Sequence, residues 1–357
     1  MTSTTSSRLL DQPTWFAAVM GTAAVSTVAA VNPGQLSSLE PASDAFAWLL
    51  WAMSVAFFVF LAIRDLAVRR LAPSIWAGLK DPAIGPGYAT IPGAINVLAL
   101  ATLRLTGIMD HSWGPWLVLG LAVVGTAMGL ALTVVFFVNA FESDNVHAEG
   151  ISGTWFIPET VILLGAILFG TIGTSLPTSW HRTMGVLSFA CLGMGLLLFA
   201  LTASLFFNRL VLHRQADNVG APAMWIMISP LSVGALALPT VAANTSELSG
   251  TWGSAVIQSA DFLASLLWGF SLWWVAAATL VTIHVGRRAL TFTPADWGFV
   301  FPSAALVLST LALGRLWQSG FVEGLAIAFS FFLVLLWVSV LFSAIASLAR
   351  ERRAAGA

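Results

Sequence analysis

Charged residues are scarce in this sequence of 357 residues. Asp, Glu, Lys and Arg together make up 9% of it and hydrophobic residues 58%, whereas about 25% charged residues is typical of soluble domains. The mean hydropathy is +0.89. The formal net charge of −1 provides no general electrostatic attraction to nucleic acid. The composition therefore excludes an ordinary soluble domain and indicates a protein that is integral to a membrane.

Residue types that carry catalysis or bind metals are also few. The one cysteine, Cys191, cannot form a disulfide within the chain. The five histidines are scattered without metal-ligand spacing, and the HExxH, GxSxG, P-loop and GxGxxG motifs are absent. An intramembrane enzyme would need clustered His, Asp, Cys or Ser at helical spacing inside the apolar segments, and the sequence has no such cluster. We therefore expect no enzyme activity, no cofactor or metal, and no nucleic-acid partner.

Ten segments are long and apolar enough to cross a lipid bilayer as helices, which takes about 20 residues each. The first segment follows a short polar start with Arg8, so a signal peptide is an alternative interpretation of it. We predict an all-α integral membrane protein in which residues 1–357 form a single transmembrane domain. The ten ranges are 13–31, 46–63, 86–105, 115–141, 152–173, 184–208, 222–243, 260–286, 296–314 and 322–349.

The distribution of Lys and Arg predicts the orientation of these helices. With ten spans, the loops and tails on one side hold twelve of the fifteen basic residues, and the other side holds only Arg104, Arg182 and Arg315. Loops rich in Lys and Arg stay in the cytoplasm. We therefore predict a multi-pass protein of the plasma (inner) membrane with both termini in the cytoplasm.

Prolines recur near the start of every second apolar segment. They are Pro13, Pro92, Pro158, Pro230 and Pro302, separated by 66 to 79 residues. A proline at the start of a helix or inside it removes a backbone donor and bends the path of the chain. The repetition predicts one helical hairpin copied five times, with successive hairpins parallel to one another around an axis along the membrane normal.

Odd-numbered and even-numbered segments differ in composition. The odd segments are shorter and richer in Pro, Gly, Ser, Thr and Asn, and the even segments are longer and more uniformly apolar. Small and weakly polar residues allow helices to approach closely, and carbonyl groups freed at a kink must be buried or face water. We expect the odd, kinked helices to form an inner ring around a central pore. An ordinary bundle with scattered kinks is the alternative.

Five stretches of the sequence resemble one family of membrane proteins. They are PTWFAAVMGTAAVS at 13–26, HAEGISGTWFIPETV at 147–161, FFNRLVLH at 206–213, AMWIMISPLSVGALAL at 223–238 and WGFVFPSAAL at 297–306. The family is that of the tellurite-resistance/dicarboxylate transporters (TDT), with TehA-like and slow-type anion channel-like members. The resemblance implies a homotrimer in a lipid bilayer, with small anions as its cargo and a pore between five inner helices of each subunit.

The resemblance also implies that a phenylalanine of the ninth helix blocks the pore, and the matching residue is Phe301, immediately before Pro302. A bulky ring at the axis would obstruct a narrow pore through its volume and by dewetting. Packing between helices, as for other phenylalanines, is the alternative. Other residues are candidates for the pore wall, because they lie at a depth similar to that of Phe301 or are small or polar residues near the recurring prolines. They are Gly21, Thr22, Ile91, Gly93, Asn96, Ile157, Ser229 and Pro302. Plain packing between helices is the alternative for each.

Three charged residues are further candidates. Arg104 and Arg315 lie near the outer ends of the third and ninth segments, where positive charge would attract anions to the pore mouth. The alternative for each is an anchor at the membrane interface, with Asp110 or Glu323 as a pairing partner. Glu159 follows Pro158, where the family has an apolar residue. It is either a proton-coupling group inside the membrane or a residue of the first helical turn, near water and favoured by the helix dipole.

These observations predict transport of small anions, whether oxyanions, organic C4-dicarboxylates or inorganic anions, through a central pore with a phenylalanine gate. A proton-coupled carrier of C4-dicarboxylate, sulfite or tellurite that uses Glu159 is the alternative within transport. A purely structural membrane scaffold is the alternative from another class.

Overall fold

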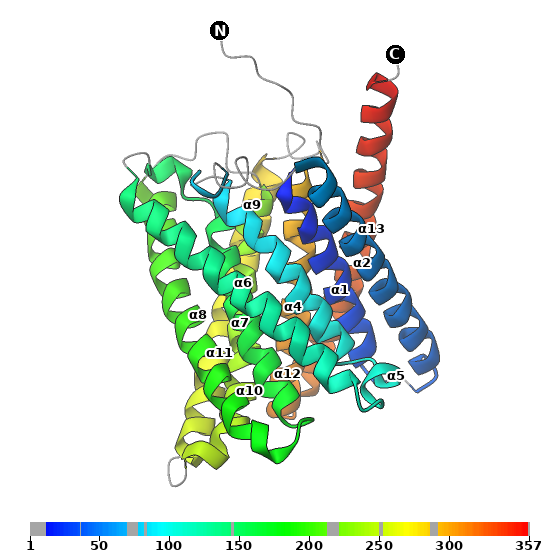
Figure 1. Ribbon diagram of the computed structural model, residues 1–357, viewed down its shortest axis with the longest axis vertical. Coiled ribbons are helices and arrows are strands. Elements are labelled where there is room, and N and C mark those ends of the chain that lie inside the picture. The colour runs from blue at the N-terminus through cyan, green and yellow to red at the C-terminus, as the bar shows by residue number, and fades with distance from the viewer. Residues whose placement is uncertain are drawn as a thin grey trace.

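The computed structural model describes residues 12–35, 37–69, 78–81, 84–143, 146–212, 221–249, 253–285 and 292–355. Within these ranges every regular element is a helix and none is a strand. The long helices lie side by side, and the first begins and the last ends at the same end of the molecule, the top in Figure 1. The prediction of an all-α protein is therefore confirmed.

Nine helices in the described part of the chain are long and apolar enough to cross a membrane. They agree with nine of the ten predicted segments, with boundaries that extend further at most ends. The remaining prediction, 86–105, corresponds to a shorter pair of elements, the 3-10 helix η3 (Gly85–Ala89) and helix α4 (Thr90–Thr102). At about 2.0 Å per 3-10 residue and 1.5 Å per α residue, the pair is roughly 30 Å long, about the thickness of the hydrocarbon core.

Four of the helices that correspond to odd segments directly follow a 3-10 helix. Besides α4, they are α1 (Phe16–Val31), α7 (Ile157–Gly173) and α12 (Val300–Leu316). Helix α10 (Ile228–Ser249) instead follows the short helix α9 (Ala221–Ile226). The preceding 3-10 helices are η2 (Pro13–Trp15), η3, η5 (Gly153–Phe156) and η8 (Pro294–Phe299).

The recurring prolines lie at these junctions. Pro92, Pro158, Pro230 and Pro302 are the second or third residues of their α-helices, and Pro13 begins η2. Since an N–H group in the first helical turn has no partner within the helix, proline fits there without the loss of a hydrogen bond. The prolines therefore lie close to the point where the helix type changes, and the predicted bend of the helices there stays a prediction.

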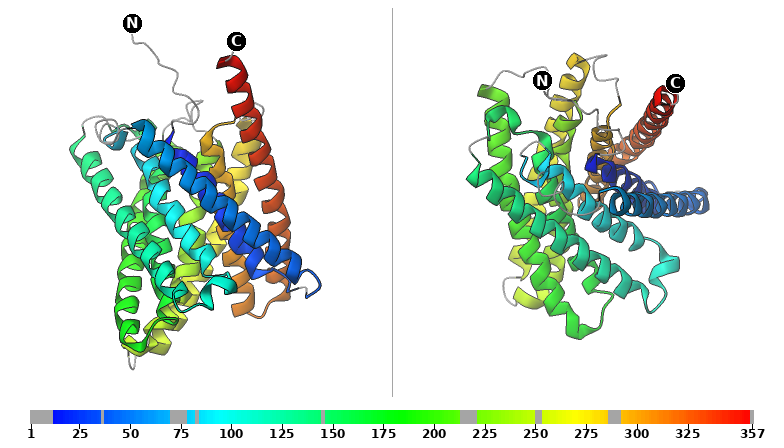
Figure 2. Two further views of the ribbon diagram at one scale, coloured as in Figure 1. Left: turned by 45° about the vertical axis from the view of Figure 1, so that its right-hand side comes forward. Right: turned by 45° about the horizontal axis from the view of Figure 1, so that its top comes forward.

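Helices α1, α4, α7, α10 and α12 pack as a closed ring. In this order each contacts the next, and α12 contacts α1. Among the residues that the structure describes, no two ring helices that are not neighbours pack extensively against each other. All five run from the top to the bottom of Figure 1, and the two views of Figure 2 show the same arrangement. Helix α1 is a full member of this ring.

The other long helices pack outside this ring. Helix α2 (Glu40–Arg69) covers α1, α6 (Gly114–Glu142) covers α4 and α7, and α8 (Thr178–Leu212) covers α7 and α10. Helices α11 (Gly253–Val285) and α13 (Gly320–Ala355) cover α10 and α12.

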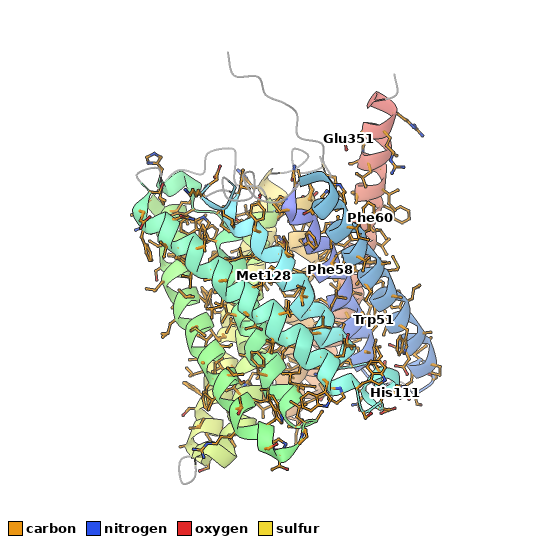
Figure 3. All side chains as sticks on the ribbon, viewed as in Figure 1. Trp51, Phe58, Phe60, His111, Met128 and Glu351 are labelled. Carbon is orange, nitrogen blue, oxygen red and sulfur yellow. The ribbon has the colours of Figure 1, made fainter. Side chains whose placement is uncertain are left out.

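Burial separates the two sets of helices. In the apolar stretches of the ring helices α1, α7, α10 and α12, 72% to 94% of the residues are buried, against 17% to 39% in the outer helices. Apolar side chains project outward from the outer helices, for example Phe60 of α2, which is 50% exposed (Figure 3). The predicted division into inner odd helices and outer even helices agrees with this burial.

The basic residues behind the predicted orientation lie mostly at the upper end of the bundle, where α2, α8 and α13 end. Arg104, Arg182 and Arg315 lie at the other end, near the starts or ends of α4, α8 and α12. Arg8, Arg70, Arg214, Arg287 and Arg288 lie outside the described residues. The side of the membrane that each end faces stays a prediction.

Candidate functional site

Two cavities lie inside the ring, one above the other. The upper cavity, at the end where the ring helices begin, has a volume of about 40 Å³, and the lower cavity has a volume of about 170 Å³. All five ring helices, or the short elements that precede them, contribute residues to each cavity. A cavity needs roughly 10 to 15 Å³ to hold one water molecule, and a water molecule takes about 30 Å³ in the liquid. The upper cavity therefore has room for one or two water molecules and the lower cavity for about six.

Phe301 separates the two cavities. Among the described residues it is the only one that lines both, and its side chain is 7% exposed. It lies in the first turn of α12, and the next residue, Pro302, lines the upper cavity. The predicted gate residue therefore borders both spaces.

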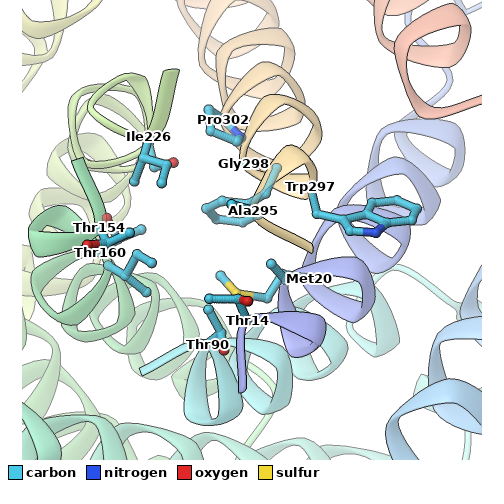
Figure 4. Close-up of a pocket in the computed structure, with 14 residues that line it drawn as sticks. Thr14, Met20, Thr90, Thr154, Thr160, Ile226, Ala295, Trp297, Gly298 and Pro302 are labelled. Carbon is cyan, nitrogen blue, oxygen red and sulfur yellow. The ribbon is translucent and has the colours of Figure 1, made fainter. Parts of the chain in front are cut away.

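The upper cavity is lined by hydroxyl groups and apolar side chains, and none of its lining residues is charged. Figure 4 shows the side chains of Thr14, Thr90, Thr154 and Thr160 around it. Thr90 donates to the carbonyl of Gly87 at 2.7 Å, and Thr160 to that of Phe156 at 2.6 Å. The hydroxyl of Thr14 is buried without a partner in the described structure. Neutral hydroxyls of this kind coordinate an anion only weakly.

The lower cavity carries positive charge. Arg104, just after α4, and Arg315, near the end of α12, both line it and are exposed at its mouth. Neither has a carboxylate within 4.0 Å in the part of the chain that the structure describes, so the alternative of pairing with Asp110 or Glu323 is not supported. Desolvation by the surrounding protein and the positive charge of Arg315 both lower the pKa of Arg104.

The lining residues of α1, α7 and α10 follow one another at alternating spacings of three and four. Those of α7 are Ile157, Thr160, Leu164, Ile167 and Thr171. Since an α-helix has 3.6 residues per turn, this spacing marks a single face along the whole helix. The same alternation continues from Ser229 along α10 and from Phe301 along α12. This pattern, which we did not use in the sequence analysis, could have identified the lining threonines.

Four of the predicted wall and gate residues line the upper cavity: Ile157, Ser229, Phe301 and Pro302. Ile91 is half-buried and lines neither cavity. Two predicted glycines lie at close contacts between helices. A Cβ at Gly21 would lie 3.1 Å from Trp297, whose ring points away from the upper cavity toward α1 in Figure 4. A Cβ at Gly93 would lie 2.9 Å from Met20. Both glycines therefore allow close packing of ring helices.

Thr22 forms a hydrogen bond with an outer helix, and Asn96 forms hydrogen bonds with a neighbouring ring helix and with an outer helix. The indole of Trp337 donates to the Thr22 hydroxyl at 3.1 Å. The Asn96 amide donates to the Val161 carbonyl at 3.1 Å and to the Thr126 hydroxyl at 3.4 Å. Thr22 lies two residues, or about 200° around the helix, from the lining residue Met20. The structure therefore places both side chains away from the cavities.

Glu159 lies in the first turn of α7 but is fully buried, so it is not near water. It lines neither cavity, because it lies two residues from Ile157 and faces the opposite side of the helix. Both carboxyl oxygens lack a hydrogen-bond partner among the described residues, as does the hydroxyl of Thr202 on α8, which the Glu159 side chain faces.

This chain is similar to one protein family and to several individual proteins. The family model described as SLAC1, voltage-dependent anion channel, matches residues 12–345. An uncharacterized transporter of Methanocaldococcus jannaschii is 25% identical over 92% of this chain and 91% of its own. The sulfite efflux pump of Trichophyton rubrum is 24% identical over 92% of this chain and 88% of its own. The malic acid transport protein of Schizosaccharomyces pombe is 23% identical over 85% of this chain and 71% of its own.

Proposed function

Because the chain belongs to the voltage-dependent anion channel (SLAC1) family, we propose that it conducts small anions through the centre of its ring of helices. The family match confirms the resemblance to the TDT family, whose members are membrane transporters. In this proposal the chain crosses the membrane ten times, as five parallel hairpins around a central pore, with η3 and α4 as the short third span.

The observation that carries the proposal is the position of Phe301 between two cavities that share all five ring helices. The cavities are two sections of one path, and the phenylalanine ring is the gate between them. Movement of this one side chain would connect a neutral, hydroxyl-lined section with a positively charged one.

The rest of the wall is consistent with conduction. The two arginines at the lower mouth raise the local concentration of anions. Weak coordination by hydroxyls above Phe301 lets an anion leave as readily as it enters. If both termini are cytoplasmic, the arginines face the exterior and the upper cavity faces the cytoplasm. The homotrimer implied by the family resemblance is part of the same proposal.

A proton-coupled carrier of C4-dicarboxylate, sulfite or tellurite is the second candidate. Two observations favour it: the buried, unpartnered carboxyl of Glu159, and the existence of relatives named as a sulfite efflux pump and a malic acid transport protein. Its weakness is that Glu159 lines neither cavity, so a proton on this residue would not meet the anion directly.

Recordings from the purified protein in a planar bilayer test the proposal. Anions are exchanged one at a time, and a pH gradient is then imposed. We expect ohmic, anion-selective currents whose reversal potential follows the anion gradient and ignores the pH gradient. Saturable flux that requires the proton gradient would favour the carrier, and the absence of any anion flux would contradict both candidates.

A further inference from the structure

The lower cavity contains two positive charges and no negative one. Arg104 and Arg315 come from the second and the fifth ring segments, one after α4 and one from α12, and both open into the same space of about 170 Å³. None of the residues that line the cavity is acidic. Two guanidinium groups therefore share one cavity and repel each other.

Each segment of the ring contributes one polar residue to this cavity. They are Thr27, Arg104, Thr171, Thr240 and Arg315, and each follows the recurring proline of its segment by 10 to 14 residues. The hydroxyls of Thr27 and Thr240 donate within their own helices, to carbonyls at 3.0 Å and 2.8 Å. The donors that remain for a ligand are the two guanidinium groups and the Thr171 hydroxyl, at positions spread around the axis.

A ligand that satisfies this set must be negatively charged and must offer several acceptor oxygens. A guanidinium group binds carboxylates and other oxyanions through paired, charge-assisted hydrogen bonds. A monovalent anion neutralises one arginine and leaves the other unpaired, whereas a divalent anion neutralises both and removes their repulsion. The cavity has space for about six water molecules, which is enough for a divalent anion such as a small dicarboxylate.

The exit toward Phe301 is unfavourable for such a ligand. Above the ring of Phe301 the path continues into a cavity of about 40 Å³ without any charged lining residue. A divalent anion that moved there would lose both arginines and most of its hydration, and a charge without such compensation is costly to bury. A bound divalent anion therefore leaves on the side from which it came.

We propose that the lower cavity is a binding site for divalent anions between Arg104 and Arg315, and that an anion bound there obstructs the passage of monovalent anions. The obstruction requires that the protein conducts anions, as proposed above, whereas the binding of a divalent anion does not require it. The selection is by valence: a divalent anion binds more tightly than a monovalent anion of the same size.

Binding is tested by calorimetric titration of the purified full-length protein with succinate, and with butyrate as the monovalent counterpart of the same chain length. We expect succinate to bind at least about tenfold more tightly than butyrate, because it gains a second charge-assisted contact. Arg104→Gln and Arg315→Gln should each reduce succinate affinity to the level of butyrate. Arg182→Gln is the matched control, since this exposed arginine of α8 lines neither cavity.

Thr171→Val provides a second variant that keeps both charges, and we expect it to weaken succinate binding by a few-fold. Size-exclusion chromatography confirms that each variant is folded. Equal affinities for succinate and butyrate, or unchanged succinate binding in the double variant of Arg104 and Arg315, would overturn the site.

Obstruction is tested by recording chloride current in a planar bilayer while succinate is added to one side at a time. We expect succinate to reduce the current only from the side of the arginines, and Arg315→Gln to remove this block. An equal reduction of the chloride current from both sides, or no reduction although succinate binds tightly, would overturn the proposed obstruction. Arginine-dependent binding in a protein that carries no current would contradict the proposed conduction and leave the site intact.

Discussion

Phe301→Ala should open the path between the two cavities. In the structure the ring of Phe301 is the only side chain of the described residues that borders both spaces, of about 40 Å³ and 170 Å³. Replacement with alanine removes the ring and leaves the neighbouring Pro302 and the first turn of α12 in place. The variant therefore tests the gate without a change in charge.

The size of the effect follows from what the native ring must give up to move aside. Displacing a buried phenylalanine forfeits about 1.5 to 3 kcal/mol of apolar burial, and holding it away from its preferred rotamer costs about 0.5 to 1.5 kcal/mol. The sum, about 2 to 4.5 kcal/mol, corresponds to a factor of roughly 30 to 1,600 in rate, at about 1.4 kcal/mol per factor of ten. We expect the chloride conductance of the variant to exceed that of the native protein by such a factor.

Single-channel and macroscopic currents in planar bilayers measure this directly. Phe299→Ala is the matched control, because Phe299 lies two residues away and packs on Trp225 at 5.6 Å without lining either cavity. The control should conduct like the native protein. A folded Phe301→Ala variant with unchanged conductance, or an equal increase in both variants, would refute the assignment of the gate.

Three further outcomes follow from the structure. Arg315→Gln should lower the anion current at low salt and change it little at high salt, because screening removes the attraction of anions to the mouth; an equal loss in both salts would contradict this role. Glu159→Gln should leave the reversal potential insensitive to pH gradients, as in the native channel, whereas a proton-dependent flux that is lost in the variant would support the carrier. Gly125→Ala should destabilise the protein by about 1 to 3 kcal/mol, since the new Cβ would lie 2.1 Å from the Asn96 side-chain oxygen. Thermal unfolding in detergent measures this, with Gly120→Ala as the control because no atom lies within 4 Å there; equal stabilities would contradict the packing.

The repeat of prolines predicted much of the architecture, because it marks where each inner segment begins. It located the residues before Pro158, Pro230 and Pro302 at one depth, and all three, Ile157, Ser229 and Phe301, line the upper cavity. It did not reveal that the prolines fit into the first turn of each helix, since a sequence does not show where a 3-10 helix gives way to an α-helix.

The errors in the predicted wall come from the angular position of residues around a helix. Thr22 and Asn96 were candidates as polar residues near the prolines, but both side chains point to neighbouring helices and form hydrogen bonds there. Counting from Phe301 in alternating steps of four and three residues correctly reaches Arg315, which lines the lower cavity.

Contacts between segments that lie far apart in the sequence could not be predicted. Arg209 suits a lipid-facing helix end by its position in the sequence, yet it is buried and donates to the Ile151 carbonyl. No local pattern predicts such a contact.

The most direct test of a continuous path is to measure from which side of the membrane a charged, membrane-impermeant thiol reagent reaches each cavity. Cys191→Ala removes the only native thiol, and Ser229→Cys or Leu308→Cys then places a single thiol in the upper or the lower cavity. With Phe301 present, each thiol should react with reagent added on one side of the membrane only, and the two thiols should react from opposite sides. With Phe301→Ala, each thiol should react with reagent added on either side. Reaction from both sides in the presence of Phe301, or from neither side in any variant, would contradict a continuous path that this residue interrupts.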